Sequence, residues 1–182
     1  VLRRPGGITR EQLLAHVRLA AQLQHALHQQ QNQLRAALLR TYPAALQLFG
    51  YPKSYFALEF LAAYPTAEEA MSLSFEDFVS FCHQHGSRQR QRIAARYVQL
   101  HEESPVASPA AVQAHRLQVQ VLATTLLAQL RLRNQVLRQL GKLFAQHPDS
   151  AIFASLPGAG ALLAPSLLAK FGFSAEQIAE AN

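Results

Sequence analysis

Residues 9–42 hold neither glycine nor proline, and their pattern of apolar residues constrains this chain more than any other feature. The apolar residues recur in steps of four and three, which is the spacing of a heptad seam on an α-helix. They are Leu13, Val17, Ala20, Leu27, Leu34 and Leu38. The seam also passes through Gln24 and Gln31, which weaken packing but can set the register. Thr9 and Gln12 have capping-box spacing, so the pattern predicts one long helix; the alternative is a solvated face in a Gln-rich segment.

A second seam of the same kind lies further along the chain. It comprises Leu122, Leu126, Leu130, Arg133, Leu137, Leu140 and Phe144. We expect this helix over residues 109–147 and the first over residues 9–40. Helices of about 38 and 30 residues would be roughly 57 and 45 Å long. Neither is stable alone in water with so few ion pairs, so the two seams must be buried on each other or on a second copy of the chain.

Short helices are expected between the two long ones, over residues 43–104. Pro43 ends the first long helix, because the residue before a proline disfavours helical geometry. Thr66 with Glu69, and Ser74 with Asp77, have the spacing of helix caps. Most of the phenylalanines fall in this region, which predicts a compact helical cluster with its own core.

No segment alternates apolar and polar residues as a half-buried strand does. The predicted fold class is therefore all-α: two long coiled-coil-like helices flanking a cluster of short helices, then a helix-hairpin-helix. Residues 1–8 are expected to be irregular, because they include Pro5-Gly6-Gly7. One cysteine excludes a disulfide framework, and 49% hydrophobic residues suffice for a core. Because the chain begins at Val1 with no signal peptide, we expect it to be a fragment of a longer protein.

The net charge of +6 is unevenly distributed. Residues 1–42 carry +5 and residues 88–142 carry +7, whereas residues 43–87 carry −4 and residues 143–182 carry −2. Fourteen of the seventeen basic residues are arginine, whose planar guanidinium group suits phosphate. Two basic segments separated by an acidic one favour nucleic-acid binding, and two solvated helix faces are the alternative.

The candidate phosphate contacts fall in two groups. Gly86-Ser87 is expected to start a helix on which Arg88, Arg92 and Arg96 share one face at i, i+4 spacing. The second group lies on the second long helix and consists of Arg131, Arg138 and Lys142.

The segment over residues 152–171 is typical of a helix-hairpin-helix. Two apolar helices flank the turn Leu156-Pro157-Gly158-Ala159-Gly160. Glycine lets a turn approach a phosphate closely, and the second helix would offer N–H groups and a positive dipole end. Pro157, Gly158, Ala159 and Gly160 are therefore candidate contacts to a nucleic-acid backbone, which would bind without reading sequence. An ordinary tight turn between core helices is the alternative.

Two other kinds of site are weaker candidates. The uncharged run over residues 150–169 approaches the length of a membrane span, but its prolines and glycines disfavour a lipid-exposed helix. Cys82, His83 and His85 cluster as metal ligands do, yet a closed zinc site needs four ligands, so a helix-terminal cluster with a buried cysteine is the preferred interpretation. We expect no metal, cofactor or membrane partner for this chain.

The order of elements resembles the transposases of the insertion-sequence-110 group, relatives of the Piv DNA invertase. The resemblance covers nearly the whole chain. Besides the two long helices, it rests on Tyr42-Pro43, on Ala62-Ala63-Tyr64-Pro65-Thr66, and on Ser155-Leu156-Pro157-Gly158-Ala159-Gly160 followed by Leu167-Leu168-Ala169. The last motif is the most specific, and Ala159 stands where the family usually has isoleucine.

The resemblance implies a three-part parent protein: a RuvC-like domain with four metal-binding acidic residues, a helical coiled-coil region, and a transposase domain with a catalytic serine. Such enzymes are RNA-guided recombinases. Residues 9–147 would match the middle region and residues 150–182 the start of the last domain. The acidic residues belong to strands that this chain lacks, and it has no Ser-Gly pair to match the family's serine context. Catalytic residues and divalent metal are therefore expected only elsewhere in the parent protein.

The sequence thus predicts a non-catalytic fragment of a prokaryotic, cytoplasmic and nucleoid-associated transposase. It would dimerise and bind DNA through the backbone, with a guide RNA as a further ligand that the resemblance implies. The alternative is a coiled-coil module that binds proteins and has no nucleic-acid role.

Overall fold

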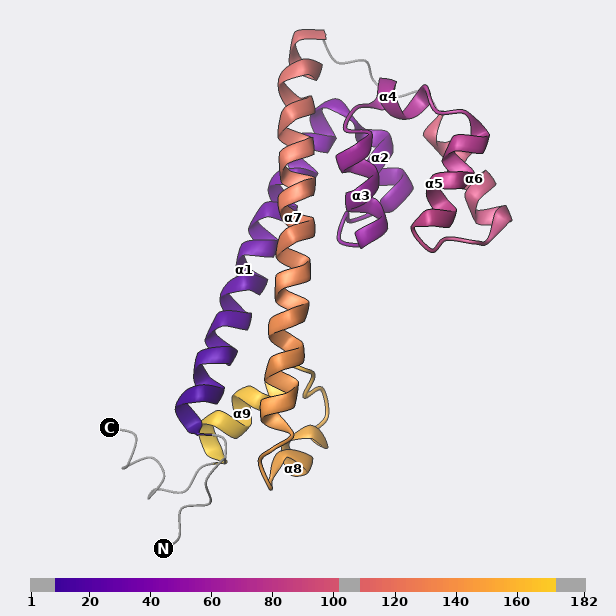
Figure 1. Cartoon of the computed structure of the whole chain (residues 1–182). Helices are drawn as coiled ribbons and strands as arrows, with labels where there is room; N and C mark the ends of the chain where they lie inside the picture. The colour runs from indigo at the N-terminus through magenta and orange to yellow at the C-terminus, as the bar shows by residue number, and fades with distance from the viewer. Residues whose placement is uncertain (1–8, 102–108, 173–182) are drawn as a thin grey trace, which may run out of the picture. The chain divides into compact units, whose positions relative to one another are not determined.

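A computed structural model describes residues 9–101 and 109–172. This part of the chain is helical and contains no strand, which confirms the all-α prediction (Figure 1). The helices are α1 (Arg10–Thr41), α2 (Pro43–Phe49), α3 (Tyr55–Ala63), α4 (Ala67–Met71), α5 (Phe75–Gln84), α6 (Arg90–Leu100), α7 (Pro109–Phe144), α8 (Ser150–Ala154) and α9 (Leu163–Phe171). The predicted irregular start over residues 1–8 lies outside the described residues, as do residues 173–182 of the predicted last domain.

Helix α1 has the predicted ends. The Gln12 N–H donates to Thr9 Oγ1 and the Thr9 N–H donates to Gln12 Oε1, both at 3.2 Å, which is a complete capping box. The helix ends at Thr41, and Pro43 starts α2 at a position where its missing N–H costs nothing. Side-chain caps also start α3, α4 and α5, at Ser54, Thr66 and Ser74 respectively.

The chain forms two compact units that divide both long helices. Unit 1 comprises Val1–Ala26 and Gln129–Asn182, so its described part contains the start of α1, the end of α7, and helices α8 and α9. Unit 2 comprises Leu27–Ala128 and contains the rest of α1 and α7 together with α2 to α6. This grouping joins the helix-hairpin-helix to parts of both long helices.

The core of unit 1 brings together helices α1, α7 and α9. Leu13 and Ala20 of α1 pack with Val136 and Leu140 of α7 and with Leu168 of α9. The Arg10 Nε–H donates at 3.1 Å to the carbonyl of Ala169, near the C-terminal end of α9. A cation at that end of a helix satisfies one of its last carbonyls and interacts favourably with the helix dipole. The start of α1 therefore holds α9 in place.

The core of unit 2 is aromatic, as the phenylalanine-rich composition predicts. Phe60 is completely buried and lies with its ring centroid 5.2–5.9 Å from those of Phe49, Phe78 and Phe81. These distances and the tilted or edge-on ring angles are those that aromatic pairs favour. A network of rings thus connects α2, α3 and α5.

The first seam is buried as predicted, largely within one chain. In unit 2, Leu27, Leu34 and Leu38 are at most 2% exposed, and even Gln31 is only 6% exposed. In unit 1, the α1 seam meets α7, so at least there the two seams cover each other within a single chain. The burial of these residues therefore does not require a second copy.

The predicted start of α6 is wrong. Gly86-Ser87 closes α5 instead: the Ser87 N–H donates to the Cys82 carbonyl at 2.8 Å, and the Gly86 N–H donates to the His83 carbonyl at 3.2 Å. Gly86 has a φ of 82°, which completes a Schellman cap. Helix α6 begins at Arg90 after this cap, so the residues that were expected to start it belong to the end of the preceding helix.

Candidate nucleic-acid interface

The hairpin between α8 and α9 contains a tight turn formed by Leu156, Pro157, Gly158 and Ala159. The Ala159 N–H donates to the Leu156 carbonyl at 3.0 Å, and Gly158 has a φ of 76°. Proline at the second position and a positive φ at the third are the features of a type II β-turn. Glycine is therefore required at position 158, because side chains with a Cβ disfavour this conformation.

Gly160 lacks such a structural reason. Its φ is not positive, and a Cβ built on it would meet no atom within 4 Å. The sequence predicts a role in the turn for both glycines, and the geometry restricts that role to Gly158. The open space beside Gly160 would be available to another molecule.

The hairpin also determines which N–H groups could meet a phosphate. The N–H groups of Ala159 and Gly160 both donate to carbonyls inside the turn, at 3.0 and 2.9 Å. The next three, those of Ala161, Leu162 and Leu163, donate to no carbonyl of the described chain. Unsatisfied N–H groups at the start of a helix form the usual arrangement for binding an anion. The N–H groups that are open to a phosphate are thus those of residues 161–163, which come after the predicted turn residues in the sequence.

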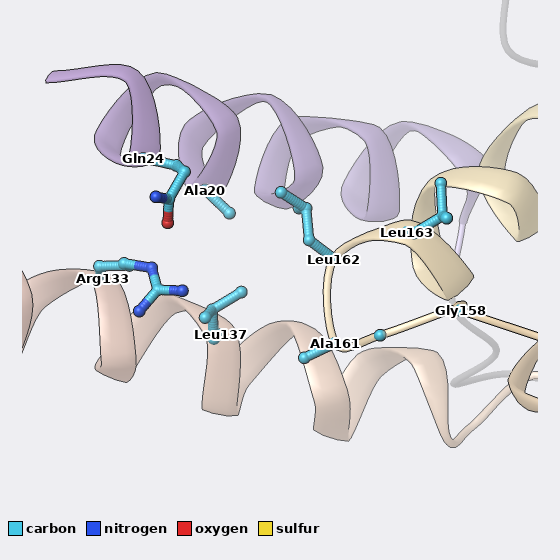
Figure 2. A pocket seen from close by; sticks show the side chains of 9 residues that line it. Ala20, Gln24, Arg133, Leu137, Gly158, Ala161, Leu162 and Leu163 are labelled. Atoms are coloured by element: carbon cyan, nitrogen blue, oxygen red, sulfur yellow. The ribbon is translucent and has the colours of Figure 1, made fainter. Parts of the chain in front are cut away.

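A pocket of about 330 Å³ lies beside this hairpin, within unit 1 (Figure 2). It is lined by Ala20 and Gln24 of α1, by Arg133 and Leu137 of α7, and by Gly158 and residues 160–163 of the hairpin. Figure 2 shows the side chain of Gln24 pointing toward α7, where the side chain of Arg133 extends along the helix at the end of the pocket away from the hairpin. The two polar side chains that interrupt the seams in this unit therefore meet at one site.

Arg133 has few partners in the described part of the chain. The residue is half-buried, and its guanidinium group donates to Asn134 Oδ1 at 3.4 Å, which is long for a hydrogen bond. No ion pair joins it to a described carboxylate. A partly desolvated cation with most of its five donors unused favours an anionic ligand.

The predicted contacts on α7 share one exposed face. Arg131, Arg138 and Lys142 are all exposed, and their separations of seven and four residues align them on one side of the helix. Arg133 is displaced by about half a turn from Arg131 and lies on the side that lines the pocket. The exposed face and the pocket are thus different surfaces of the same helix end.

The predicted group of three arginines in unit 2 does not form one helical face. Arg88 precedes α6, whereas Arg92 is exposed on its first turns. Arg96 is half-buried, and its guanidinium carbon lies 5.1 Å from the centroid of the Phe56 ring, which is a cation–π contact. The late start of α6 explains the first difference and the aromatic core explains the second.

The cysteine and histidines singled out in the sequence have structural surroundings. Cys82 is completely buried, and burial raises the pKa of its thiol against the opposing positive charge of Arg96. The His85 ring pairs with the Glu59 carboxylate and stacks near Phe81. Among the described residues, no three histidine, cysteine, aspartate or glutamate side chains are placed to share a metal ion. No helix in the same part of the chain has the length and apolarity needed to cross a membrane.

Gln24 and Arg133 are not among the binding residues predicted from the sequence, although both interrupt the apolar seams there. Polar interruptions on both long helices are a signal that points toward the pocket, but Gln31 also interrupts the first seam and does not line it. Comparison with protein families, with characterised proteins and with solved structures finds no significant match to this chain.

Proposed function

We propose that this chain is a nucleic-acid-binding fragment of a DNA transposase or recombinase of the insertion-sequence-110 group. The observation that carries the proposal is the excess of basic over acidic residues in unit 1. Its described part has seven basic residues and only two acidic ones, Glu11 and Asp149. The basic residues are Arg10, Arg18, Arg131, Arg133, Arg138, Lys142 and Lys170. A basic surface next to a glycine-containing hairpin suits contacts with a sugar–phosphate backbone.

The proposal includes the ligands and the setting that the resemblance implies. The chain binds DNA, with a guide RNA as a second nucleic-acid partner, in the prokaryotic cytoplasm at the nucleoid. It has no catalytic activity of its own, because the family's metal-binding acidic residues and catalytic serine have no counterparts in this sequence. Divalent metal is assigned to the catalytic domain of the parent protein.

Binding of a fluorescent DNA duplex at several salt concentrations tests the proposal. The double variant Arg138→Gln/Lys142→Gln should weaken binding equally for unrelated sequences, and the slope of log K against log salt should fall by about one for each lost contact. Lys53→Gln is a matched control in unit 2, since it removes one exposed positive charge from the less basic part of the chain. An unchanged slope in the double variant, or a failure of the wild type to bind DNA, would contradict the proposal.

Dimerisation is the second part of the proposal, and it is also what the alternative function requires. Leu117 and Val121 of α7 are 60% and 62% exposed and lie one turn apart, so together they form an apolar strip on unit 2. This strip favours a protein-binding coiled-coil module if the chain does not bind nucleic acid. Light scattering should give a mass above that of one chain, and the double variant Leu117→Gln/Val121→Gln should lower this mass. A wild-type monomer at high protein concentration would exclude a dimer for both proposed functions.

A further inference from the structure

We infer that the pocket bounded by Ala20, Gln24, Arg133, Leu137 and the 158–163 segment binds a single phosphate group, with Arg133 as its cation. The inference rests on the proposed function and deepens it, because it names one site at which a nucleic-acid backbone would be held. Phosphate is the shared chemistry of two possible sources, a nucleic-acid backbone and a small phosphate, and the experiment below separates them.

The first argument is the position of Arg133 in the helix. It occupies a seam position of α7, on the side that carries the buried Val136 and Leu140, rather than on the exposed face with Arg138. A leucine at this position would continue the apolar seam. An arginine that is half-buried in its place loses part of its hydration, and its one long hydrogen bond to Asn134 does not compensate for that loss.

The second argument is the polarity and shape of the pocket. Ala20, Leu137 and Leu162 give it apolar walls, while Gln24 and Arg133 place an amide and a cation at one end (Figure 2). Apolar walls lower the local dielectric constant, which strengthens the attraction between the guanidinium group and an anion. A planar guanidinium group can donate two parallel hydrogen bonds to a phosphate.

The third argument is Gly160, which lines the same pocket. Neither its backbone conformation nor its neighbours require glycine, since a Cβ there would enter open space. The absence of a side chain therefore leaves the pocket open beside the first N–H groups of α9. This observation is independent of the charge of Arg133.

The simpler explanation is that Arg133 extends its guanidinium group into water while its methylene groups pack against the seam. The two explanations differ in the DNA affinity that they predict for Arg133→Met. If the arginine is only a polar interruption, the variant gains seam packing and binds DNA as well as any other variant that lacks one positive charge. If it holds a phosphate, the variant gains stability but loses affinity by about tenfold, the usual worth of a charge-assisted contact.

The first experiment measures DNA affinity and thermal unfolding for Arg133→Met, with Arg138→Met as the control that removes the same charge from the exposed face of the same helix. Gly160→Val supplies an independent variant that fills the pocket without changing charge. We expect Arg133→Met and Gly160→Val to weaken binding by about tenfold, Arg138→Met by about twofold to threefold, and none of the three to lower the helical content. Equal losses for Arg133→Met and Arg138→Met, with wild-type binding by Gly160→Val, would overturn the inference.

The second experiment titrates inorganic phosphate into the chain against chloride of equal ionic strength and follows NMR signals of the Arg133 Nε–H and the Gly160 amide. Saturable shifts that Arg133→Met abolishes support the phosphate pocket even if the chain binds no DNA, in which case a small phosphate is the source and the proposed function fails. DNA binding that depends on Arg138 and Lys142 but not on Arg133, without phosphate shifts, would leave the proposed function standing and reject the pocket.

Discussion

The two units provide different surroundings for the same kind of side chain. In unit 2, Arg116 donates to the Glu69 carboxylate and Arg96 lies over the Phe56 ring, so both cations have partners within the fold. In unit 1, Arg133 lies beside apolar walls with one long hydrogen bond. The contrast follows from what the described part of each unit contains: that of unit 2 has five acidic residues and the aromatic core, whereas that of unit 1 has two acidic residues.

This comparison shows that net charge alone does not identify a binding surface. Unit 2 contains eight described basic residues, one more than unit 1, yet part of that charge is used internally. A basic residue is a candidate contact only where the fold leaves its donors available. By that criterion, Arg138 and Lys142 remain candidates and Arg96 is a poor one.

The largest expected effect removes the aromatic packing on which unit 2 depends. Phe60→Ala should lower the free energy of unfolding by about 3–5 kcal/mol, because it leaves a cavity among the rings of Phe49, Phe78 and Phe81. Urea denaturation followed by circular dichroism measures this loss. Phe171→Ala is the matched control in unit 1: its side chain is 73% exposed, so the change should be within about 0.5 kcal/mol. Similar losses in both variants would show that burial of the Phe60 ring is not what stabilises unit 2.

A smaller effect separates the two glycines of the unit 1 hairpin. Gly158→Ala should cost about 1–2 kcal/mol, because alanine must adopt the positive φ of the type II turn. Gly160→Ala should leave stability unchanged or raise it slightly, since neither its φ nor its surroundings oppose a Cβ. Thermal unfolding of the two variants provides the measurement, and equal losses would show that the hairpin requires both glycines.

Replacing Tyr42 of unit 2 by phenylalanine should raise the stability of the chain. The side chain is 1% exposed, and its hydroxyl has no hydrogen-bond partner among the described residues. Tyr42→Phe should therefore stabilise the chain by about 1 kcal/mol, because it removes a buried polar group that is left unsatisfied. Tyr51→Phe is the control: this exposed hydroxyl donates to Asn32 Oδ1 at 2.8 Å, and its loss should be neutral or slightly destabilising.

The same tyrosine predicts a pH dependence. Burial raises the pKa of Tyr42, so its hydroxyl stays neutral in the folded chain at pH values at which the unfolded chain ionises. Stability should be fully present below pH about 10, the ordinary pKa of tyrosine, and should fall as the pH rises above it toward the raised value. Chemical denaturation across this range should show a shallower decline for Tyr42→Phe; parallel curves for the two proteins would contradict the assignment.

The smallest expected effect concerns the arginines of α6. Arg96→Gln should cost about 0.5–1 kcal/mol through loss of the contact with the Phe56 ring. Arg92→Gln, one turn earlier and exposed, should change stability by less than about 0.5 kcal/mol. Chemical denaturation of the pair tests whether unit 2 uses only one of these arginines for packing, and a loss of stability at Arg92 instead would reverse that conclusion.

Local features of the fold could be predicted because their causes lie within a few residues of each other. The capping box at Thr9, the break at Pro43 and the seam along α1 depend on hydrogen bonds and periodicity inside one segment. The wrong prediction for the start of α6 also has a local cause. Gly86-Ser87 can either precede a helix or close one, and the hydrogen bond from the Ser87 N–H to the Cys82 carbonyl shows that it closes α5.

The candidate site could be predicted only in part. Pro157-Gly158 identifies a turn from sequence, because proline and a positive-φ glycine at adjacent positions specify its type. The need for glycine at position 160 has no local cause, and its role could be judged only once the space around it was known. Likewise, nothing near Arg96 in the sequence indicates that Phe56 would lie beneath it.

The sequence by itself thus determined the helices, their caps and the apolar seam along α1, because backbone hydrogen bonding and apolar periodicity act over one or two turns. The tertiary structure alone decided which charges are used. It brought Arg10 to the carbonyl of Ala169 and Gln24 into the same pocket as Arg133, and these pairs are more than a hundred residues apart in the chain. A charge becomes available or committed only when distant segments pack around it, since packing both removes water and supplies or withholds a partner.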